Sequence, residues 1–425
     1  MIAGAVNSFF VEAAMTITEP GTVLALYIKE LTGSVFLAGL LPSLRYFGWL
    51  APQFFAAGRL QRLRRFLPAV QWLEAIRGSF YLLVAAAIAL WSLDRPNLVL
   101  ILFFSLFMVT RLAAGCSAVA RNEIVARMVP EGQRAALISL RRLTGAVAGL
   151  LAGFLIGYIL DARVASFPAN YALLIAIAGL FFGLAVLSFS LVIEPELPIE
   201  RRERNIMEQA KQAPRLLRTD RRYALYVGVR LASAGTALAT PFYILFATEL
   251  LGAPASMAGA FISMRTLVRI ASNAFWGREC ARRGSAWVLK AGTALGMLTP
   301  LTVVIFYGLM KLWGAQPTPF WVSWAFGLVF ALQGLAGSAE GLAQIAYLYD
   351  ISPPGERPTY YGLANTIVGP MHFLPALGGA LVALVGYVPI FGVAALFMAV
   401  AYGLAARLEG LGSATPARAG VALNE

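Results

Sequence analysis

The sequence predicts an all-α membrane protein with twelve transmembrane helices arranged as two six-helix repeats. Hydrophobic residues make up 59% of the 425 residues and charged residues only 13%, and the mean hydropathy is +0.74. The one long polar segment, residues 194–222, lies between two apolar parts of similar length. A bilayer core about 30 Å thick needs roughly 20 apolar residues per helix. Because polar residues do not alternate with apolar ones, helices are expected rather than a barrel.

Apolar runs between polar breaks define the expected spans, which are residues 5–28, 34–57, 68–92, 97–120, 137–160, 170–193, 223–248, 254–276, 286–310, 319–345, 359–385 and 388–408. The first run lacks the basic leader of a cleaved signal and is interpreted as an uncleaved span. The chain then divides into an N-terminal half (1–193), a cytoplasmic linker (194–222), a C-terminal half (223–411) and a short cytoplasmic tail (412–425).

Basic residues gather in alternate loops, and this predicts the orientation. Arginines cluster after the second, fourth and eighth spans and in the linker, whereas the opposite loops hold isolated charges such as Lys29, Arg95, Arg163 and Lys311. Loops rich in Lys and Arg stay in the cytoplasm. We therefore expect a multi-pass protein of the inner or plasma membrane with both termini cytoplasmic. The net charge of +13 has the same origin and does not indicate nucleic-acid binding.

The two halves share short motifs at nearly one offset. The matching pairs are Glu30-Leu31-Thr32-Gly33 with Glu249-Leu250-Leu251-Gly252, Gly58-Arg59 with Gly277-Arg278, and Pro130-x-Gly132-x-Arg134 with Pro353-x-Gly355-x-Arg357. With six spans in each half, these matches predict a parallel repeat whose axis lies along the membrane normal.

The fourth span and one basic loop carry a family resemblance. Arg111-x-x-x-Gly115-x-x-Ala118 places an arginine inside an apolar helix, and Gly58 opens a basic run after the second span. These features are similar to the major facilitator superfamily over nearly the whole chain, although the acidic residue that the family carries in this loop is missing. The resemblance implies secondary transport through a central cavity lined mainly by the first, fourth, seventh and tenth helices.

Charged residues inside the spans are the candidate substrate or coupling residues. A charge near the bilayer midplane costs at least ~2.5–3.5 kcal/mol, so it usually faces a partner or a wet cavity. On the cavity map that the resemblance implies, the first set is Glu12, Glu19, Arg111, Arg230 and Glu340. A second set comprises Arg45, Arg265, Arg269 and His372.

Some of these residues also have structural interpretations. Glu12 and Arg230 lie at similar depths in the first and seventh spans, which suggests a pair between the halves, either a gate or a strut. Arg45 and Arg265 occupy near-equivalent places in the repeat. His372 is the only histidine and is either a structural hydrogen-bonding group or a proton relay.

Two further patterns concern the helices themselves. Glu74 and Arg77 are three residues apart and are expected to form a local pair. Pro20 follows Glu19 and predicts a kink in the first span, because proline removes a backbone donor. Gly145, Gly149, Gly153 and Gly157 recur every four residues in the fifth span, where they serve either close helix packing or coupling.

The expected function is secondary active transport of a small solute by alternating access. Buried carboxylates favour proton coupling, and the surplus of arginine in the spans leans towards an anionic solute. The alternatives are a multidrug exporter of the same fold and a membrane sensor without transport activity. No HExxH, CxxC or phosphate-binding loop occurs, so we expect no enzyme activity, metal or cofactor. The partners are then the solute, protons and the lipid bilayer, and the protein is expected to be a monomer.

Overall fold

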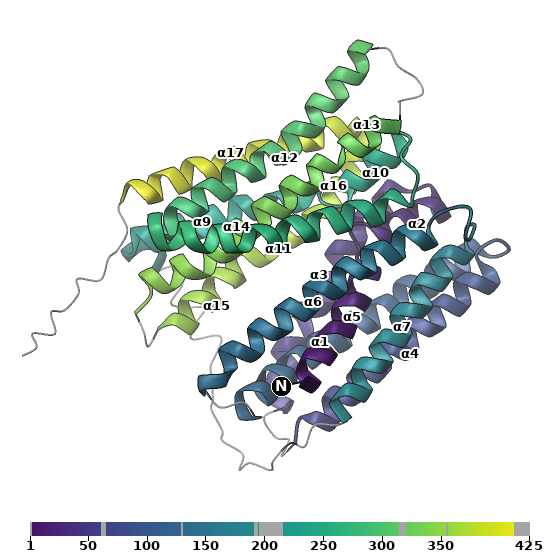
Figure 1. Ribbon diagram of the computed structural model, residues 1–425, viewed down its shortest axis with the longest axis horizontal. Helices are drawn as coiled ribbons and strands as arrows, with labels where there is room; N and C mark the ends of the chain where they lie inside the picture. The colour runs from purple at the N-terminus through teal and green to yellow at the C-terminus, as the bar shows by residue number, and fades with distance from the viewer. Residues whose placement is uncertain are drawn as a thin grey trace, which may run out of the picture.

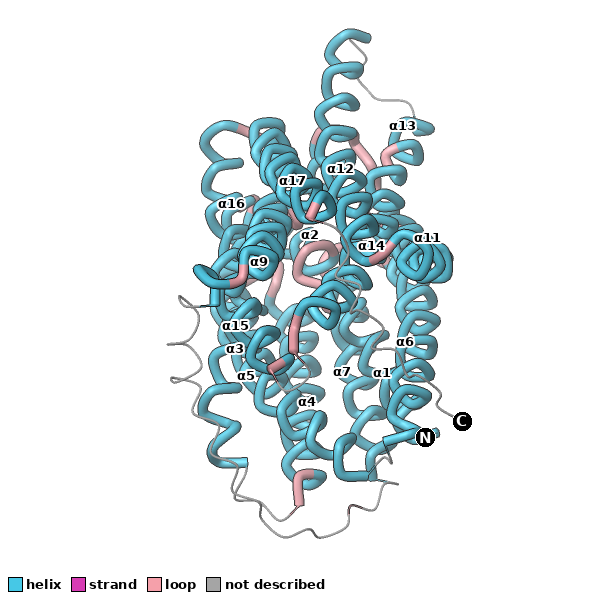
Figure 2. The backbone as a smooth tube through the Cα atoms, turned by 90° about the vertical axis from the view of Figure 1, so that its left-hand side faces the viewer, coloured by secondary structure: helices cyan, strands magenta, loops and turns pink. Residues whose placement is uncertain are grey.

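The computed structural model describes residues 2–60, 65–128, 131–190, 194, 216–313, 320–353 and 356–411. Most of the predicted linker, the predicted tail and the basic loop residues 61–64 lie outside the described residues, as do Pro130 and Gly355 of the loop repeat. Figure 2 shows the described chain as helices joined by short loops, without a strand in these ranges.

The first part of the chain forms seven α-helices. They are α1 (Ile2–Ile17), α2 (Val23–Thr32), α3 (Val35–Leu60), α4 (Leu67–Trp91), α5 (Pro96–Met128), α6 (Glu131–Ile159) and α7 (Ala169–Ser190). Helix α5 runs eight residues beyond the predicted end of the fourth span at residue 120. The prediction that Arg121 and Arg127 lie in a loop was therefore wrong.

The second part follows the same order with more interruptions. Its elements are α9 (Arg221–Ala234), the 3-10 helix η1 (Gly235–Ala239), α10 (Phe242–Glu249), α11 (Met257–Arg283), α12 (Ser285–Trp313), α13 (Phe320–Ala325), α14 (Gly327–Ile351), α15 (Arg357–Val368), the 3-10 helix η2 (Gly369–Phe373), α16 (Leu374–Val385) and α17 (Tyr387–Gly410). Across the described ranges, nine helical segments are long and apolar enough to cross a membrane.

Prolines break several spans. The kink predicted at Pro20 is confirmed, because helix α1 ends at Ile17 and α2 begins at Val23. The predicted span 223–248 is not continuous: it divides into α9, η1 and α10, with Pro241 just before α10. The predicted span 359–385 is likewise interrupted by η2, which contains Pro370. Each proline lacks the N–H that would continue the helical hydrogen bonds.

The helices form two bundles. Figure 1 shows α1–α7, in purple to teal, packed together beside a second bundle of α9–α17, in green to yellow. Within the bundles α1 packs on α6 and α7, and α12 packs on α14 and α17. Between the bundles the main contacts join α3 to α16 and α6 to α11, with a smaller contact between α2 and α10.

Small residues bring the backbones together at both main contacts. A Cβ added to Gly259 on α11 would collide with the Gly157 nitrogen and the Gly153 oxygen on α6. A Cβ added to Gly39 on α3 would lie 3.1 Å from the Gly379 Cα on α16. Such positions let two helices approach more closely than larger side chains allow.

Polar contacts join the bundles at the end where α2 and α10 finish, which we call the closed end. The Lys29 ammonium lies 2.6 Å from a Glu249 carboxylate oxygen across the bundles, and the Tyr387 hydroxyl donates to the other oxygen at 2.6 Å. Gly33 and Gly252, which follow α2 and α10, both have left-handed backbones, with φ of 68° and 66°. The two matching sequence motifs thus end in the same turn conformation.

The segment between the bundles is anchored at both sides. The buried Glu194 carboxylate accepts hydrogen bonds from the N–H groups of Phe66 (2.7 Å) and Leu67 (2.7 Å) at the start of α4. On the other side, the Asp220 side chain accepts from the Tyr223 N–H at 3.0 Å and caps α9. Such caps satisfy helix N–H groups that have no partner within the helix.

Candidate functional site

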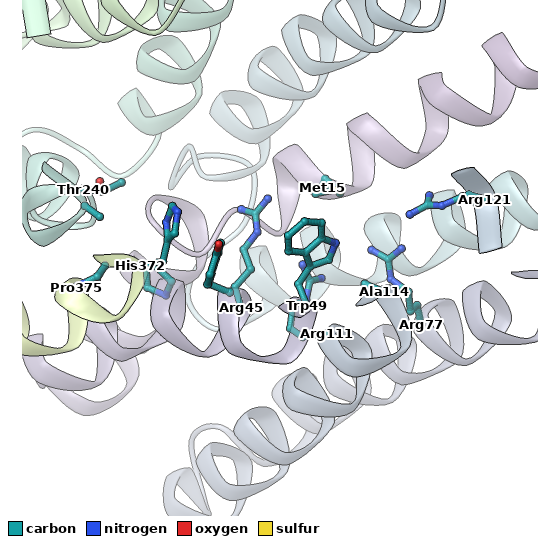
Figure 3. A pocket seen from close by; sticks show the side chains of 13 residues that line it. Met15, Arg45, Trp49, Arg77, Arg111, Ala114, Arg121, Thr240, His372 and Pro375 are labelled. Carbon is teal, nitrogen blue, oxygen red and sulfur yellow. The ribbon is translucent and has the colours of Figure 1, made fainter. Parts of the chain in front are cut away.

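A cavity of about 500 Å³ lies between the two bundles. Its wall comes from α1, α3, α4 and α5 of the first bundle and from η1, η2, α16 and the turn before α10 in the second. The lining residues are Met15, Pro42, Arg45, Tyr46, Trp49, Arg77, Arg111, Ala114, Arg121, Ala237, Thr240, His372 and Pro375. Figure 3 shows the arginines following one another along this space, from Arg121 past Arg77 and Arg111 to Arg45.

Helix α3 gives the cavity its mixed cationic and aromatic wall. Pro42, Arg45, Tyr46 and Trp49 recur at the spacing of one helix face, so all four side chains reach the same space. Glycines allow α3 to lie close to α5: a Cβ on Gly48 would lie 2.5 Å from the Arg111 Cβ. The close approach brings the ring of Trp49 and the guanidinium of Arg111 to one side of the cavity, as Figure 3 shows.

Arg111 is buried, with 3% of its surface exposed, yet it lines the cavity. Its Nη2 donates to the Tyr81 hydroxyl, and its Nε donates to Thr110 at 3.5 Å. The guanidinium carbon lies 5.1 Å from the Phe107 ring centre. None of the carboxylates among the described side chains forms an ion pair with it. The positive charge is thus held by neutral groups alone.

The other cavity arginines share two carboxylates. Arg45 Nη1 lies 2.8 Å from Glu19 Oε2. The predicted local pair is confirmed, since Arg77 Nη1 lies 2.6 Å from Glu74 Oε2. Glu74 also accepts from the Ser117 hydroxyl at 2.5 Å and lies 3.6 Å from Arg121.

The charges around the cavity do not balance. Four guanidiniums line it, and the carboxylates that pair with them number two. A buried charge without a counter-ion is costly, so this excess of positive charge is one that an anion could neutralise. Figure 3 places Arg111, the arginine without a carboxylate partner, between Arg77 and Arg45 in the row.

The second bundle contributes a mostly apolar wall. Its lining residues are Ala237, Thr240, His372 and Pro375. The His372 ring stacks on the Tyr46 ring of the opposite bundle, with centres 3.8 Å apart and planes 21° apart. Histidine is therefore placed in an aromatic stack at the cavity, and both the relay and the structural interpretation of His372 stay open.

Three of the five residues in the first set lie elsewhere. Arg230 on α9 donates to the Asn365 side chain at 3.0 Å, and no ion pair joins it to Glu12 among the described side chains. The suggested pair between the halves is therefore not formed. Glu12 is exposed on α1 beside Gly145 of α6. Glu340 on α14 faces Gly292 and Gly296 of α12, within the second bundle.

The remaining candidates fall at contacts between helices. The Arg265 backbone lies against Gly334 of α14, and Arg269 is exposed. The guanidiniums of Arg45 and Arg265 both interact electrostatically with Glu19, and that of Arg45 forms an ion pair with it. In the glycine stripe, Gly145 and Gly149 face α1, whereas Gly153 and Gly157 face α11. The stripe therefore touches both its own bundle and the other one.

Sequence reasoning missed Arg121, Tyr46, Trp49 and Tyr81. Arg121 was assigned to a loop because α5 was expected to end at residue 120. Trp49 was detectable in principle because it follows Arg45 by four residues, and Tyr46 because it precedes Trp49 by three, spacings that share a helix face. Tyr81 had no such signal, since its contact with Arg111 joins α4 to α5. No group of three or more metal-binding side chains occurs in the ranges that the structure describes.

Comparison with known proteins identifies the fold. No protein-family model matches the sequence, and no curated protein matches it significantly. Similar solved structures include an auto-inhibited POT family peptide transporter (14% identity, TM-score 0.73, covering 95% of this chain and 96% of that one). The nucleoside transporter NupG (14%, TM-score 0.68, 96% and 98%) and a D-xylose-proton symporter (16%, TM-score 0.68, 95% and 95%) are also similar. The protein therefore has the fold of major facilitator superfamily transporters.

Proposed function

We propose that the protein is a secondary transporter of a small anionic solute that works by alternating access. Twelve spans would form two six-helix halves, residues 1–193 and 223–411, which rock about the cavity between them. The similar structures support this architecture, because they are a nucleoside transporter, a D-xylose-proton symporter and a peptide transporter and align over at least 95% of both chains.

The observation that carries the anionic substrate is the unpaired guanidinium of Arg111. Its planar group can bind a carboxylate or phosphate through two parallel hydrogen bonds. Among the described side chains its hydrogen-bond and ring contacts are all with neutral groups. A bound anion would supply the missing counter-charge at a depth where an unpaired charge is costly. A cation, by contrast, would meet four guanidiniums, which argues against export of cationic drugs.

Proton coupling would use Glu19, one of the two carboxylates that pair with this guanidinium row. Glu19 is paired with Arg45, and it sits at the break between α1 and α2, where the backbone is not helical. A substrate anion that binds Arg45 would compete with Glu19 for the same guanidinium. The displaced carboxylate could then take up a proton, so that substrate and proton cross together. A D-xylose-proton symporter is among the proteins of this fold.

The direction of opening follows from the contacts between the bundles. Helices α2 and α10 meet at the closed end, whereas the cavity extends along α5 as far as Arg121, near the linker. If the linker is cytoplasmic, as the basic loops predict, this conformation faces the cytoplasm. Both termini would lie on that side, and the monomer would be sufficient because the cavity is formed within one chain.

The test is solute uptake by purified protein in proteoliposomes, with and without an imposed pH gradient. Labelled organic anions, sugars and cations of similar size form the panel. Uptake of an anion that rises with the pH gradient is expected. Arg111→Gln removes charge-assisted hydrogen bonds and should weaken anion binding about 10- to 150-fold, and Arg111→Lys should also impair transport.

The matched control is Arg407→Lys on the exposed face of α17, which should transport normally. Melting temperatures of the three variants separate a loss of substrate binding from a loss of stability. Uptake of a neutral or cationic solute that is indifferent to Arg111→Gln would contradict the proposal.

A further inference from the structure

Resting on the proposed anion transport, we propose that the substrate is an aromatic carboxylate without an amino group. The inference depends on how charge and ring surface are distributed over the two cavity walls. The first bundle supplies all four guanidiniums and two aromatic side chains, Tyr46 and Trp49. The second supplies His372 together with small or apolar groups. A guest that matches both walls has one anionic end and a flat apolar body.

Aromatic rings from both bundles lie at the cavity. Trp49 lines the cavity and keeps 41% of its surface exposed, and its ring centre lies 6.2 Å from that of Tyr46. The Tyr46 ring in turn stacks on His372. Two aromatic rings in an offset-stacked or edge contact gain free energy beyond that of the area they bury, because their π-systems interact, and a puckered ring has no π-system. Three neighbouring rings from both bundles therefore favour a planar guest.

The anionic end would bind at Arg111. Trp49 and Arg111 come from the adjoining helices α3 and α5 and line the same cavity, so one small molecule can reach both. The carboxylate would accept hydrogen bonds from the guanidinium while the ring attached to it lies along the indole. A cavity of about 500 Å³ holds a molecule with one or two fused rings, since pockets of ~300–1,000 Å³ take ligands up to drug size.

The absence of an amino group follows from the carboxylates. None of the lining residues is acidic, and the two carboxylates behind the wall, Glu19 and Glu74, are each paired with arginine. An ammonium group would therefore have no carboxylate partner among the described lining residues and would be repelled by the guanidiniums. The same reasoning disfavours sugars, because Thr240 and Tyr46 provide the only hydroxyl groups of the described lining. The lack of a carboxylate partner disfavours amino acids and peptides, and the small number of lining hydroxyl groups disfavours sugars.

The experiment measures dissociation constants for the purified full-length protein by titration calorimetry. Five probes separate the requirements: benzoate, naphthoate, cyclohexanecarboxylate, benzamide and phenylalanine. Cyclohexanecarboxylate matches the charge of benzoate but has a puckered ring, benzamide keeps the ring without the charge, and phenylalanine adds the ammonium group. We expect benzoate or naphthoate to bind about 2- to 12-fold more tightly than cyclohexanecarboxylate. This range corresponds to the free energy of one aromatic stacking contact. Benzamide and phenylalanine should not bind.

Two variants test the site itself. Trp49→Leu should remove the preference for the planar acids, whereas Trp72→Leu, at an indole on α4 that is 73% exposed, should retain it. Melting temperatures show whether Trp49→Leu remains folded, and Tyr46→Leu provides a second variant of the same wall. With an intact fold, loss of the preference in Trp49→Leu or Tyr46→Leu but not in Trp72→Leu supports the proposal.

The contrary outcomes are distinct. Equal binding of benzoate and cyclohexanecarboxylate, unchanged in Trp49→Leu, would overturn the aromatic substrate and leave anion transport intact. Binding of phenylalanine as tight as that of benzoate would overturn the exclusion of amines. If no planar acid binds at millimolar concentration, the proposal of an aromatic carboxylate substrate fails. If benzamide binds and the acids do not, the proposal of anion transport fails as well.

Discussion

The close contact of α6 with α11 predicts that one methyl group on Gly259 shifts the balance between conformations. A Cβ at this position would collide with backbone atoms of Gly153 and Gly157, and backbone cannot move aside as a flexible side chain can. Overpacking of this kind costs typically ~1–3 kcal/mol. The cost falls on the conformation in which the bundles touch here and not on one in which they separate. Gly259→Ala should thus disfavour the observed conformation by about 5- to 150-fold, at 1.36 kcal/mol per tenfold.

Two further glycines calibrate this effect. Gly277 lies on the same helix, and no atom lies within 4 Å of an added Cβ. Gly277→Ala therefore reproduces the gain in helix propensity, about 1 kcal/mol, without the collision. Gly157→Ala should fall between the two, because its added Cβ would lie 3.2 Å from the Ser256 oxygen.

The assay is labelling of a cysteine in the cavity from the closed end. Thr240→Cys in a background of Cys116→Ser and Cys280→Ser, which removes both native thiols, gives one reactive site at the cavity wall. A membrane-impermeant maleimide added on the external side should react faster in Gly259→Ala than in Gly277→Ala. Equal rates in the two variants, with equal melting temperatures, would refute the reasoning from backbone contact.

Three other predictions follow. A double-mutant cycle of Lys29→Met and Glu249→Gln should give a coupling energy of up to about 1 kcal/mol in thermal unfolding, as for other partly exposed ion pairs; additive effects would argue against a role of this pair in closure. Glu19→Gln should abolish accumulation driven by a pH gradient while counterflow at equal concentrations persists, and unchanged accumulation would remove Glu19 from coupling. Reporter tags at Asp94 and Lys311 should both be located on the external side of the membrane, and a cytoplasmic location of the tag at Lys311 would contradict the prediction of twelve spans.

The proline at position 20 shows what local sequence can predict. Proline removes a backbone hydrogen-bond donor from a helix, so a kink between α1 and α2 was predictable without tertiary contacts, although α3 continues through Pro42 and Pro52 and α12 continues through Pro300. The same reasoning applies to Pro241 and Pro370, where the expected spans were drawn as continuous helices. Those breaks were missed because long apolar runs were given more weight than the proline inside each run.

The site was less predictable because its contacts join separate helices. The pair of Glu74 and Arg77 was expected, since three residues of separation place both on one helix face. That Arg121 lies near the same carboxylate depends on how α5 packs on α4, which no local pattern specifies. The assignment of Arg230 and Glu12 to a pair relied on equal depth in the membrane. The depth of a residue in the membrane does not specify which face of its helix the side chain lies on.

The anchors at Glu194 and Asp220 bear on how far the bundles can move apart. Each one fastens an end of the central segment to its own bundle, so residues 195–215 provide most of the free length. Fully extended, these 21 residues would reach at most roughly 76 Å, at 3.3–3.6 Å per residue, far more than a rocking motion requires. The covalent connection by itself therefore does not limit such a motion. Mechanical coupling between the halves then depends on their non-covalent contacts, above all those of α3 with α16 and of α6 with α11, where glycines bring the backbones together.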